Sequence, residues 1–124
     1  MNAIVFDTGA LIALERNRQR IKAVFKTARV DAMSIVVPSV CVAEWWRGRT
    51  NLRERILESV FVAHTDDALM RVAGEARARL PSATCIDTIA MATAARYGGP
   101  IFTSDVSDML SLQRVFPAVR VLGV

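Results

Sequence analysis

Hydrophobic residues along this chain occur in short runs, separated by longer segments in which apolar positions recur every three or four residues. The runs have the length and the Val, Ile and Phe content of buried strands, and the longer segments have the period of amphipathic helices. The pattern predicts strands at residues 3–6, 33–38, 60–63, 100–104 and 119–124. It predicts helices from the Asp7–Thr8 cap to residue 15 and at 18–28, 39–47, 52–58 and 66–80. It also predicts an Ala-rich helix that has Asp87 in its first turn and reaches residue 97, and a last helix that contains Asp108.

The order of these elements predicts the fold class. Strands that alternate with helices form a parallel sheet covered by helices on both faces, so we expect an α/β protein. Ligands of such sheets bind beyond the carboxyl ends of the strands, where the strand order reverses. Asp7 and Asp105 each directly follow a predicted strand. They are expected to converge on one crevice if their strands are neighbours.

Five acids stand apart from all other charges because their segments contain no basic residue. These acids are Asp7, Glu44, Asp87, Asp105 and Asp108. The other seven acids each lie within five residues of an arginine, as on a solvated helix face. A carboxylate in apolar surroundings costs several kcal/mol unless it is paired or bound to a metal. A shared cation is the expected compensation.

Each acid taken singly has an ordinary explanation. Asp7, Asp87 and Asp105 are placed to cap helices or to interact with helix dipoles. Glu44 is harder to explain in this way because it is expected in the middle of a helix, between Ala43 and Trp45. The inference of a shared cation therefore rests on all of these isolated acids together, near strand ends and on apolar helices, and not on any one of them.

Oxygen ligands of this kind suit Mg²⁺ or Mn²⁺, with water and substrate phosphate completing the coordination. Such a site activates a bound water, so no side-chain nucleophile is required. Thr103 and Ser104, beside Asp105, are candidates to orient a ligand or a water, although hydroxyls at a strand end are as often structural. His64 is the only histidine. A nuclease with two catalytic histidines and a zinc site of the usual His/Cys type are therefore excluded.

Length and composition limit the remaining possibilities. The 124 residues contain no repeat or linker, so residues 1–124 are expected to form a single domain. The hydrophobic content of 52% suggests that a partner or a second copy covers some apolar surface. The longest uncharged stretches, of about 14 to 16 residues, are too short for a membrane span, and no signal peptide is visible. We therefore expect a cytoplasmic protein, with Cys41 and Cys85 as reduced core residues.

The charge balance fits a polyanionic ligand handled through a metal. The chain has 16 Lys and Arg against 12 Asp and Glu. Without the five isolated acids, the remaining surface is strongly basic, and 14 of the basic residues are arginines, whose planar groups suit phosphate. A GC-rich genome is an equally good explanation of the arginine bias, so the total charge is weak support for nucleic acid.

Four motifs resemble those of a known family. They are DT at Asp7–Thr8, PSVCVAE at residues 38–44, DTIAMATAA at 87–95 and TSDVSD at 103–108. In order, spacing and total length they are similar to the PIN-domain ribonucleases, and more narrowly to the VapC toxins of VapBC toxin–antitoxin pairs. The resemblance implies a Rossmann-like three-layer sandwich with sheet order 3-2-1-4-5.

The same resemblance implies a function. It implies an endoribonuclease that depends on Mg²⁺ or Mn²⁺, leaves 5′-phosphate and 3′-hydroxyl ends, and is inhibited by a cognate antitoxin. Transfer RNA or ribosomal RNA is the expected substrate, and a homodimer the expected assembly. By comparison with the family motif, Asp7, Glu44, Asp87 and Asp105 match the catalytic and metal-binding quartet, and Asp108 matches a frequent fifth acid. Thr8 falls beside the first of these acids, as a supporting residue.

The sequence departs from the family pattern at Trp45–Trp46, where relatives usually carry a smaller aliphatic residue first. Core packing is the expected role of Trp45. Trp46 is a candidate for contact with the antitoxin or with a stacked base. Arg47 and Arg49 are candidate phosphate or partner contacts, with simple solvation as an equal alternative.

Two other classes of protein are alternatives to this assignment. A PIN-like RNA-binding or assembly module that has lost its chemistry is the main alternative, and the intact quartet argues against it. A phosphatase or receiver domain would use Asp7 as a phosphorylated nucleophile. The second acid expected in haloacid dehalogenase phosphatases is absent, because position 9 is Gly, and the only lysines, Lys22 and Lys26, lie far from the end of the sheet that a receiver domain needs.

Overall fold

The computed structural model describes residues 2–124, which form a parallel five-stranded sheet with helices on both faces. The strand order is β3-β2-β1-β4-β5, so the predicted α/β class and sheet order are both confirmed. The strands are β1 Ala3–Phe6, β2 Ser34–Pro38, β3 Phe61–Ala63, β4 Ile101–Thr103 and β5 Val121–Gly123. The strand order reverses between β1 and β4, where α/β sheets bind their ligands.

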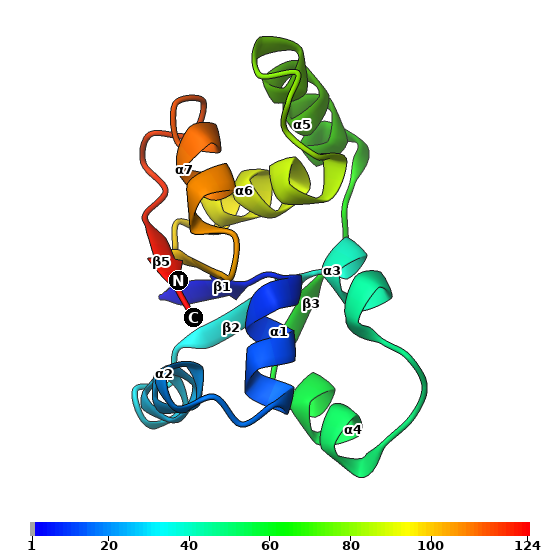
Figure 1. Ribbon diagram of the computed structural model, residues 1–124, viewed down its shortest axis with the longest axis vertical. Coiled ribbons are helices and arrows are strands. Elements are labelled where there is room, and N and C mark those ends of the chain that lie inside the picture. Colours follow the sequence, from blue (N-terminus) through cyan, green and yellow to red (C-terminus); the bar gives the residue numbers. More distant parts are fainter. Residues whose placement is uncertain (1) are drawn as a thin grey trace.

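Seven helices in the described residues connect the strands. They are α1 Thr8–Glu15, α2 Gln19–Val30, α3 Ser39–Trp45, α4 Asn51–Glu58, α5 Asp67–Arg79, α6 Cys85–Tyr97 and α7 Val106–Leu112. Figure 1 shows α1, α2 and α4 on one side of the sheet and α5, α6 and α7 on the other. Helix α5 packs against α6 rather than against the sheet.

The core forms where β1 and β4 meet the Ala-rich helix α6. Every residue of β1 and β4 is buried, as are Thr88 to Ala94 in α6. The rings of Phe6 and Phe102 meet edge to face at 5.8 Å, which fixes the two neighbouring strands against each other. The region that carries the predicted acids is therefore built on the buried core.

Helix α3 ends earlier than the pattern predicts. A helix to Arg47 was expected, but Trp46 already has extended backbone angles, with φ −71° and ψ 120°. A further helical residue would turn about 100° away from Trp45. Instead the two indole rings pack edge to face at 6.0 Å, and Trp46 stays half-buried. Arg47 and Arg49 therefore lie in the segment after the helix.

Glycines end helix α6. Gly98 adopts the left-handed conformation, with φ +73°, in which glycine ends helices at no steric cost. Gly99 then passes so close to the Ala3 carbonyl that a side chain would overlap it. This close approach brings the chain back beside β1 to begin β4. Within residues 2–124 there is no helix long and apolar enough to span a bilayer.

Candidate metal centre

The carboxyl ends of β1 and β4 hold two of the predicted acids side by side. The Asp7 amide donates to the Phe102 carbonyl at 3.3 Å, so the β1–β4 pairing continues to the first residue of the site. Thr103 ends β4 and is fully buried. Its hydroxyl accepts the Asp105 amide at 2.9 Å and hydrogen-bonds to the Asp7 side chain. One threonine thus contacts both acids, and its supporting role in the site stays a prediction.

Asp7 combines a structural and an electrostatic role. It is the N-cap of α1, and its Oδ1 accepts the Ala10 amide at 3.0 Å. The side chain is buried, and this burial raises the pKa of the carboxyl to about 6, against the lowering effect of its bonds from Thr103 and Ala10. The charges of Asp87 and Asp105 raise the pKa further. A nearby cation would reverse this cost of ionisation.

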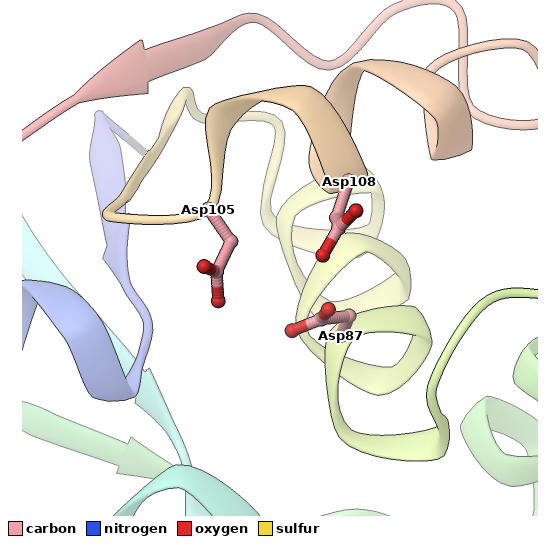
Figure 2. A group of neighbouring side chains, drawn as sticks. All are labelled: Asp87, Asp105 and Asp108. Carbon is pink, nitrogen blue, oxygen red and sulfur yellow. The ribbon is translucent and has the colours of Figure 1, made fainter.

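Asp87, Asp105 and Asp108 form a tight acidic group. Each offers a carboxylate oxygen, and these oxygens all lie within 4.8 Å of one another. Figure 2 shows the three side chains pointing toward a common space, Asp87 from the first turn of α6 and the other two from the start of α7. Asp105 stands at the N-cap position but makes no side-chain cap bond, so capping does not explain it. Partial burial raises the pKa of Asp87, and the charges of Asp105, Asp108 and Glu44 add to this effect.

Glu44 reaches the same cleft from α3. The Thr8 hydroxyl donates to Glu44 Oε1 at 2.6 Å, which ties the start of α1 to the end of α3. Thr8 therefore orients one of the acids, a contact that its position next to Asp7 did not disclose. Glu44 lies one residue from the end of the helix and is exposed, so its charge is accommodated by solvent and by Thr8 rather than buried.

All five acids line one cleft of about 380 Å³. Its other lining residues are Thr8, Gly9, Cys41, Thr84, Cys85, Ile86 and Ala90. Convergence of Asp7 and Asp105 at the switch point is as predicted. The expectation that the acids sit in apolar surroundings is correct for Asp7 and partly for Asp87, whereas Glu44, Asp105 and Asp108 are exposed. Trp45 and Met109, which follow Glu44 and Asp108, are buried in the core, and the three carboxylates line the open cleft.

The cleft suits a hard divalent cation. Among its possible ligand atoms, carboxylate and hydroxyl oxygens outnumber the two thiol sulfurs of Cys41 and Cys85, and no Lys or Arg from residues 2–124 lines it. Like charges gathered at this spacing repel one another unless a cation lies between them. Mg²⁺ and Mn²⁺ favour such oxygen donors and retain water in their remaining positions. The residues present therefore fit the cation that the sequence implied.

Three predicted contact residues lie outside the cleft. Ser104 is exposed and lines an adjoining groove beside α1, where it packs against Gly9. Arg47 lines a second groove with Trp45 and Arg53. Arg49 is 3.8 Å from Glu54 in an exposed ion pair. That Ser104 orients a ligand or a water stays a prediction. Contact of Arg47, Arg49 and the half-buried Trp46 with RNA or the antitoxin also stays a prediction.

Several residues of the site carry no sequence signal of their own. Gly9 allows close packing, because a β-carbon there would overlap the side chain and amide of Ser104. Cys41 lies at the cleft floor, and burial raises the pKa of its thiol to about 12. Cys85 is exposed at the start of α6, so its prediction as a core residue is wrong. Helical spacing placed Cys85 among apolar residues but did not show that the first turn of α6 faces the cleft.

The sequence predicts Glu15 as a solvated helix residue, whereas in the structure it holds a partly buried network together. Its carboxylate accepts the Trp45 indole N–H at 2.8 Å and the Arg53 guanidinium at 3.0 Å. Trp45 is 1% exposed, so the predicted core role of this tryptophan is confirmed and its polar edge is satisfied. The network joins α1, α3 and α4 beneath the cleft.

The fold and the acidic cleft together define an α/β protein with a carboxylate site at the switch point of a 3-2-1-4-5 sheet. Neither a family model nor a curated protein matches the sequence. Solved structures do match. One chain of VapBC2 from Rickettsia felis, bound to a DNA fragment from their promoter, aligns with a TM-score of 0.78 and 11% identity over 98% of both chains.

Two other complexes give the same picture. One chain of DNA-bound VapBC from Salmonella typhimurium aligns with a TM-score of 0.77 and 15% identity, over 99% of this chain and 98% of that one. A chain of a toxin–antitoxin complex from Klebsiella pneumoniae aligns with a TM-score of 0.65 and 17% identity over 94% of both chains. This likeness establishes a shared fold over nearly the whole chain. The fold matches that of a PIN domain, as the sequence motifs implied.

Proposed function

We propose that this protein is a metal-dependent endoribonuclease and the toxin of a toxin–antitoxin pair. The observation that carries the proposal is the convergence of Asp87, Asp105 and Asp108 within 4.8 Å, in a cleft that Asp7 and Glu44 also line. A phosphodiester is a fitting substrate because an acidic cleft in a basic protein attracts a polyanion only when a cation bridges the two. The similarity to toxin–antitoxin structures supports the toxin role.

The residues divide into ligands and supports. Asp7, Glu44, Asp87, Asp105 and Asp108 would hold Mg²⁺ or Mn²⁺. When bound, the cation supplies an activated water and stabilises charge on the phosphate. Thr8 holds Glu44 in place, and Thr103 holds both Asp7 and Asp105. These two hydroxyls preorganise the carboxylates before substrate arrives, which lowers the cost of reaching the reactive geometry.

Cleavage of total cellular RNA by the purified protein tests the enzyme. We expect discrete products with 5′-phosphate ends when Mg²⁺ or Mn²⁺ is present, and none with EDTA. Asp87→Asn should abolish cleavage, because it removes a charge from the acidic group. Glu75→Gln, at an exposed position of α5, is the matched control and should cleave normally. Metal-independent products, or equal activity in Asp87→Asn, would contradict the proposal.

We also propose that an antitoxin segment covers an apolar groove between α2 and α4. This groove, of about 280 Å³, includes Leu14, Phe25, Leu52 and Ile56. Its rim carries Lys22, Lys26, Arg29 and Arg55, so an amphipathic segment with acidic flanks is complementary to it. Leu52→Asp should weaken inhibition by the coexpressed antitoxin without changing cleavage by the isolated toxin. An antitoxin that leaves cleavage undiminished would refute the pairing.

The proposed toxin acts in the cytoplasm on tRNA or rRNA, and we propose that it is a homodimer. Exposed apolar side chains remain on the surface, including Phe61, Met70 and Val72. A second copy that covered such residues would account for the high apolar content. Sedimentation at micromolar concentration should give the dimer mass. A monomer at all concentrations would rule the dimer out.

A further inference from the structure

An arginine-rich groove leaves the acidic cleft along helix α1. It has a volume of about 590 Å³ and is lined by residues of α1, the start of α2 and the residue after β4, including Ile12, Arg16, Arg18, Arg20 and Ser104. Gly9 lines both this groove and the acidic cleft, so the two hollows adjoin. A ligand that occupies the cleft can therefore continue into the groove.

A second hollow continues the basic surface around α1. It has a volume of about 400 Å³ and shares Ile12 and Arg16 with the first. Arg47 and Arg53 lie on its other side. Arg53 is neutralised by Glu15, with a separation of 3.0 Å between the charged groups. Arg47 has no ion-pair partner among residues 2–124.

The other arginines of this surface are not neutralised within the protein. Arg16, Arg18 and Arg20 are exposed, and no carboxylate of residues 2–124 lies within ion-pair distance of them or of Arg47. Four unpaired guanidinium groups around one short helix create a strongly positive surface. A flexible polyanion that lies along α1 would neutralise it and release its own counterions.

We propose that the groove of Arg16, Arg18 and Arg20 holds the phosphates of a single-stranded RNA next to the scissile bond. The inference rests on the proposed function and names the path of its substrate. A basic groove that adjoins an acidic cleft favours RNA over an acidic peptide, because the same ligand must pass from the arginines into the carboxylate cleft. There a phosphodiester is held through a cation, whereas a row of carboxylate side chains brings only repulsion. The three arginine side chains contact phosphates and not base edges, so the groove contributes to affinity for RNA rather than to sequence specificity.

Fluorescence anisotropy of a labelled single-stranded RNA tests this path. The full chain is used in EDTA, so that binding is measured without cleavage. The groove variant carries Arg16→Ala, Arg18→Ala and Arg20→Ala. The matched control carries Arg71→Ala, Arg77→Ala and Arg79→Ala on α5, which removes the same charge from the other side of the sheet (Figure 1). Circular dichroism and thermal melting verify that both variants are folded.

We expect the groove variant to bind RNA at least tenfold more weakly, and the control to stay within about twofold of the unmodified chain. The slope of log affinity against log salt should fall by about two in the groove variant, because each lost contact to a single strand contributes roughly 0.7. Equal losses in both variants, or none in the groove variant, would overturn the proposal. Groove-dependent binding of polyglutamate as tight as that of RNA would overturn it in favour of an acidic protein partner.

The outcomes for the groove and for the enzyme are separable. Groove-dependent RNA binding without any metal-dependent cleavage would refute the nuclease and support the RNA path. Metal-dependent cleavage with unchanged RNA binding by the groove variant would support the nuclease and refute the path. In an active enzyme the groove variant should raise KM for RNA and leave kcat nearly unchanged, because Arg16, Arg18 and Arg20 lie outside the cleft that holds the reacting phosphate.

Discussion

Asp7 shows how one residue serves both stability and function. Its Oδ1 caps α1 through the Ala10 amide, while burial beside the other acids makes its ionised form costly. The sequence offered capping and metal binding as competing explanations, and the structure shows the cap directly. Capping needs only an acceptor oxygen, which a neutral amide also provides. The charge of Asp7 is therefore not needed for the fold.

Asp7→Asn should stabilise the metal-free protein at neutral pH. The folded-state pKa of Asp7, about 6, lies above its ordinary value of 3.8, so folding favours the protonated carboxyl. Its stabilising contribution is complete below about pH 4 and is lost as pH rises through about 6. We expect urea unfolding at about pH 7.5 to show the variant more stable by roughly 2–3 kcal/mol, and this gain to vanish near pH 4. The same gain at both pH values would contradict the assignment of the cost to ionisation.

The role of Glu15 could not be predicted from its neighbours in the sequence. It lies beside Arg16 in sequence, yet its partners are Trp45 and Arg53, 30 and 38 residues away. Glu15→Ala leaves the buried Trp45 indole N–H without an acceptor, and it leaves the largely buried Arg53 guanidinium with only the Gly48 carbonyl. We expect the free energy of unfolding to fall by about 2–3 kcal/mol. Chemical denaturation measures it.

The control for Glu15 is the exposed pair of Asp67 and Arg71. These two charged groups are 3.0 Å apart on α5, and their side chains are 79% and 78% exposed. Asp67→Ala should change stability by no more than about 0.5 kcal/mol, because solvent screens such pairs. Equal effects of the two substitutions would show that the Glu15 network contributes no more than a surface ion pair.

At the scale of elements, the site depends on how closely α1 approaches the end of β4. Gly9 permits this approach, since a β-carbon would overlap Ser104. The hydrophobic pattern predicted both elements and placed an acid at the end of each strand. It gave no measure of the distance between them, because the period of a helix or strand is a property of local sequence. The contacts of Thr8, Gly9 and Thr103 set the distance between α1 and the end of β4, and these contacts form only when the strands are paired.

Gly9→Ala should separate Asp7 from Asp105. We expect a loss of about 1–3 kcal/mol in stability, typical of overpacking, together with at least tenfold slower RNA cleavage. Gly74→Ala is the matched control, because no atom lies within 4 Å of the β-carbon that it adds to α5. It should raise stability by about 0.5–1 kcal/mol and leave cleavage unchanged. Unaltered stability in Gly9→Ala would show that Ser104 yields without disturbing the site.

The end of α3 marks a limit of the sequence pattern at this scale. The pattern predicts Glu44 in mid-helix because apolar residues continue to Trp46. The helix ends at Trp45, because Trp46 already has extended backbone angles. The rings of Trp45 and Trp46 meet edge to face, and the arginines that follow lie in a loop rather than on a helical face. The positions of Arg47 and Arg49 were therefore beyond prediction.

For the molecule as a whole, the sequence predicted the order of the elements and the crevice at the switch point. Val- and Ile-rich runs alternating with helices are sufficient for the parallel sheet. The order that makes β1 and β4 neighbours was implied only by the resemblance of the four motifs to a known family. The exposure of Glu44, Asp105 and Asp108 and the arginine groove beside α1 were not predictable in the same way. Both depend on which faces of distant elements meet, and no single segment encodes such a surface.

Binding of Mn²⁺ tests the central claim most directly, because it needs no knowledge of the RNA target. The free-ion electron paramagnetic resonance signal is followed as the purified protein is titrated. The account predicts saturable Mn²⁺ binding that Mg²⁺ displaces, at least about tenfold weaker binding in Asp105→Asn, and unchanged binding in Asp31→Asn, at an exposed position outside the cleft. No saturable binding, or equal binding by Asp105→Asn, would contradict the claim that these acids form a metal centre.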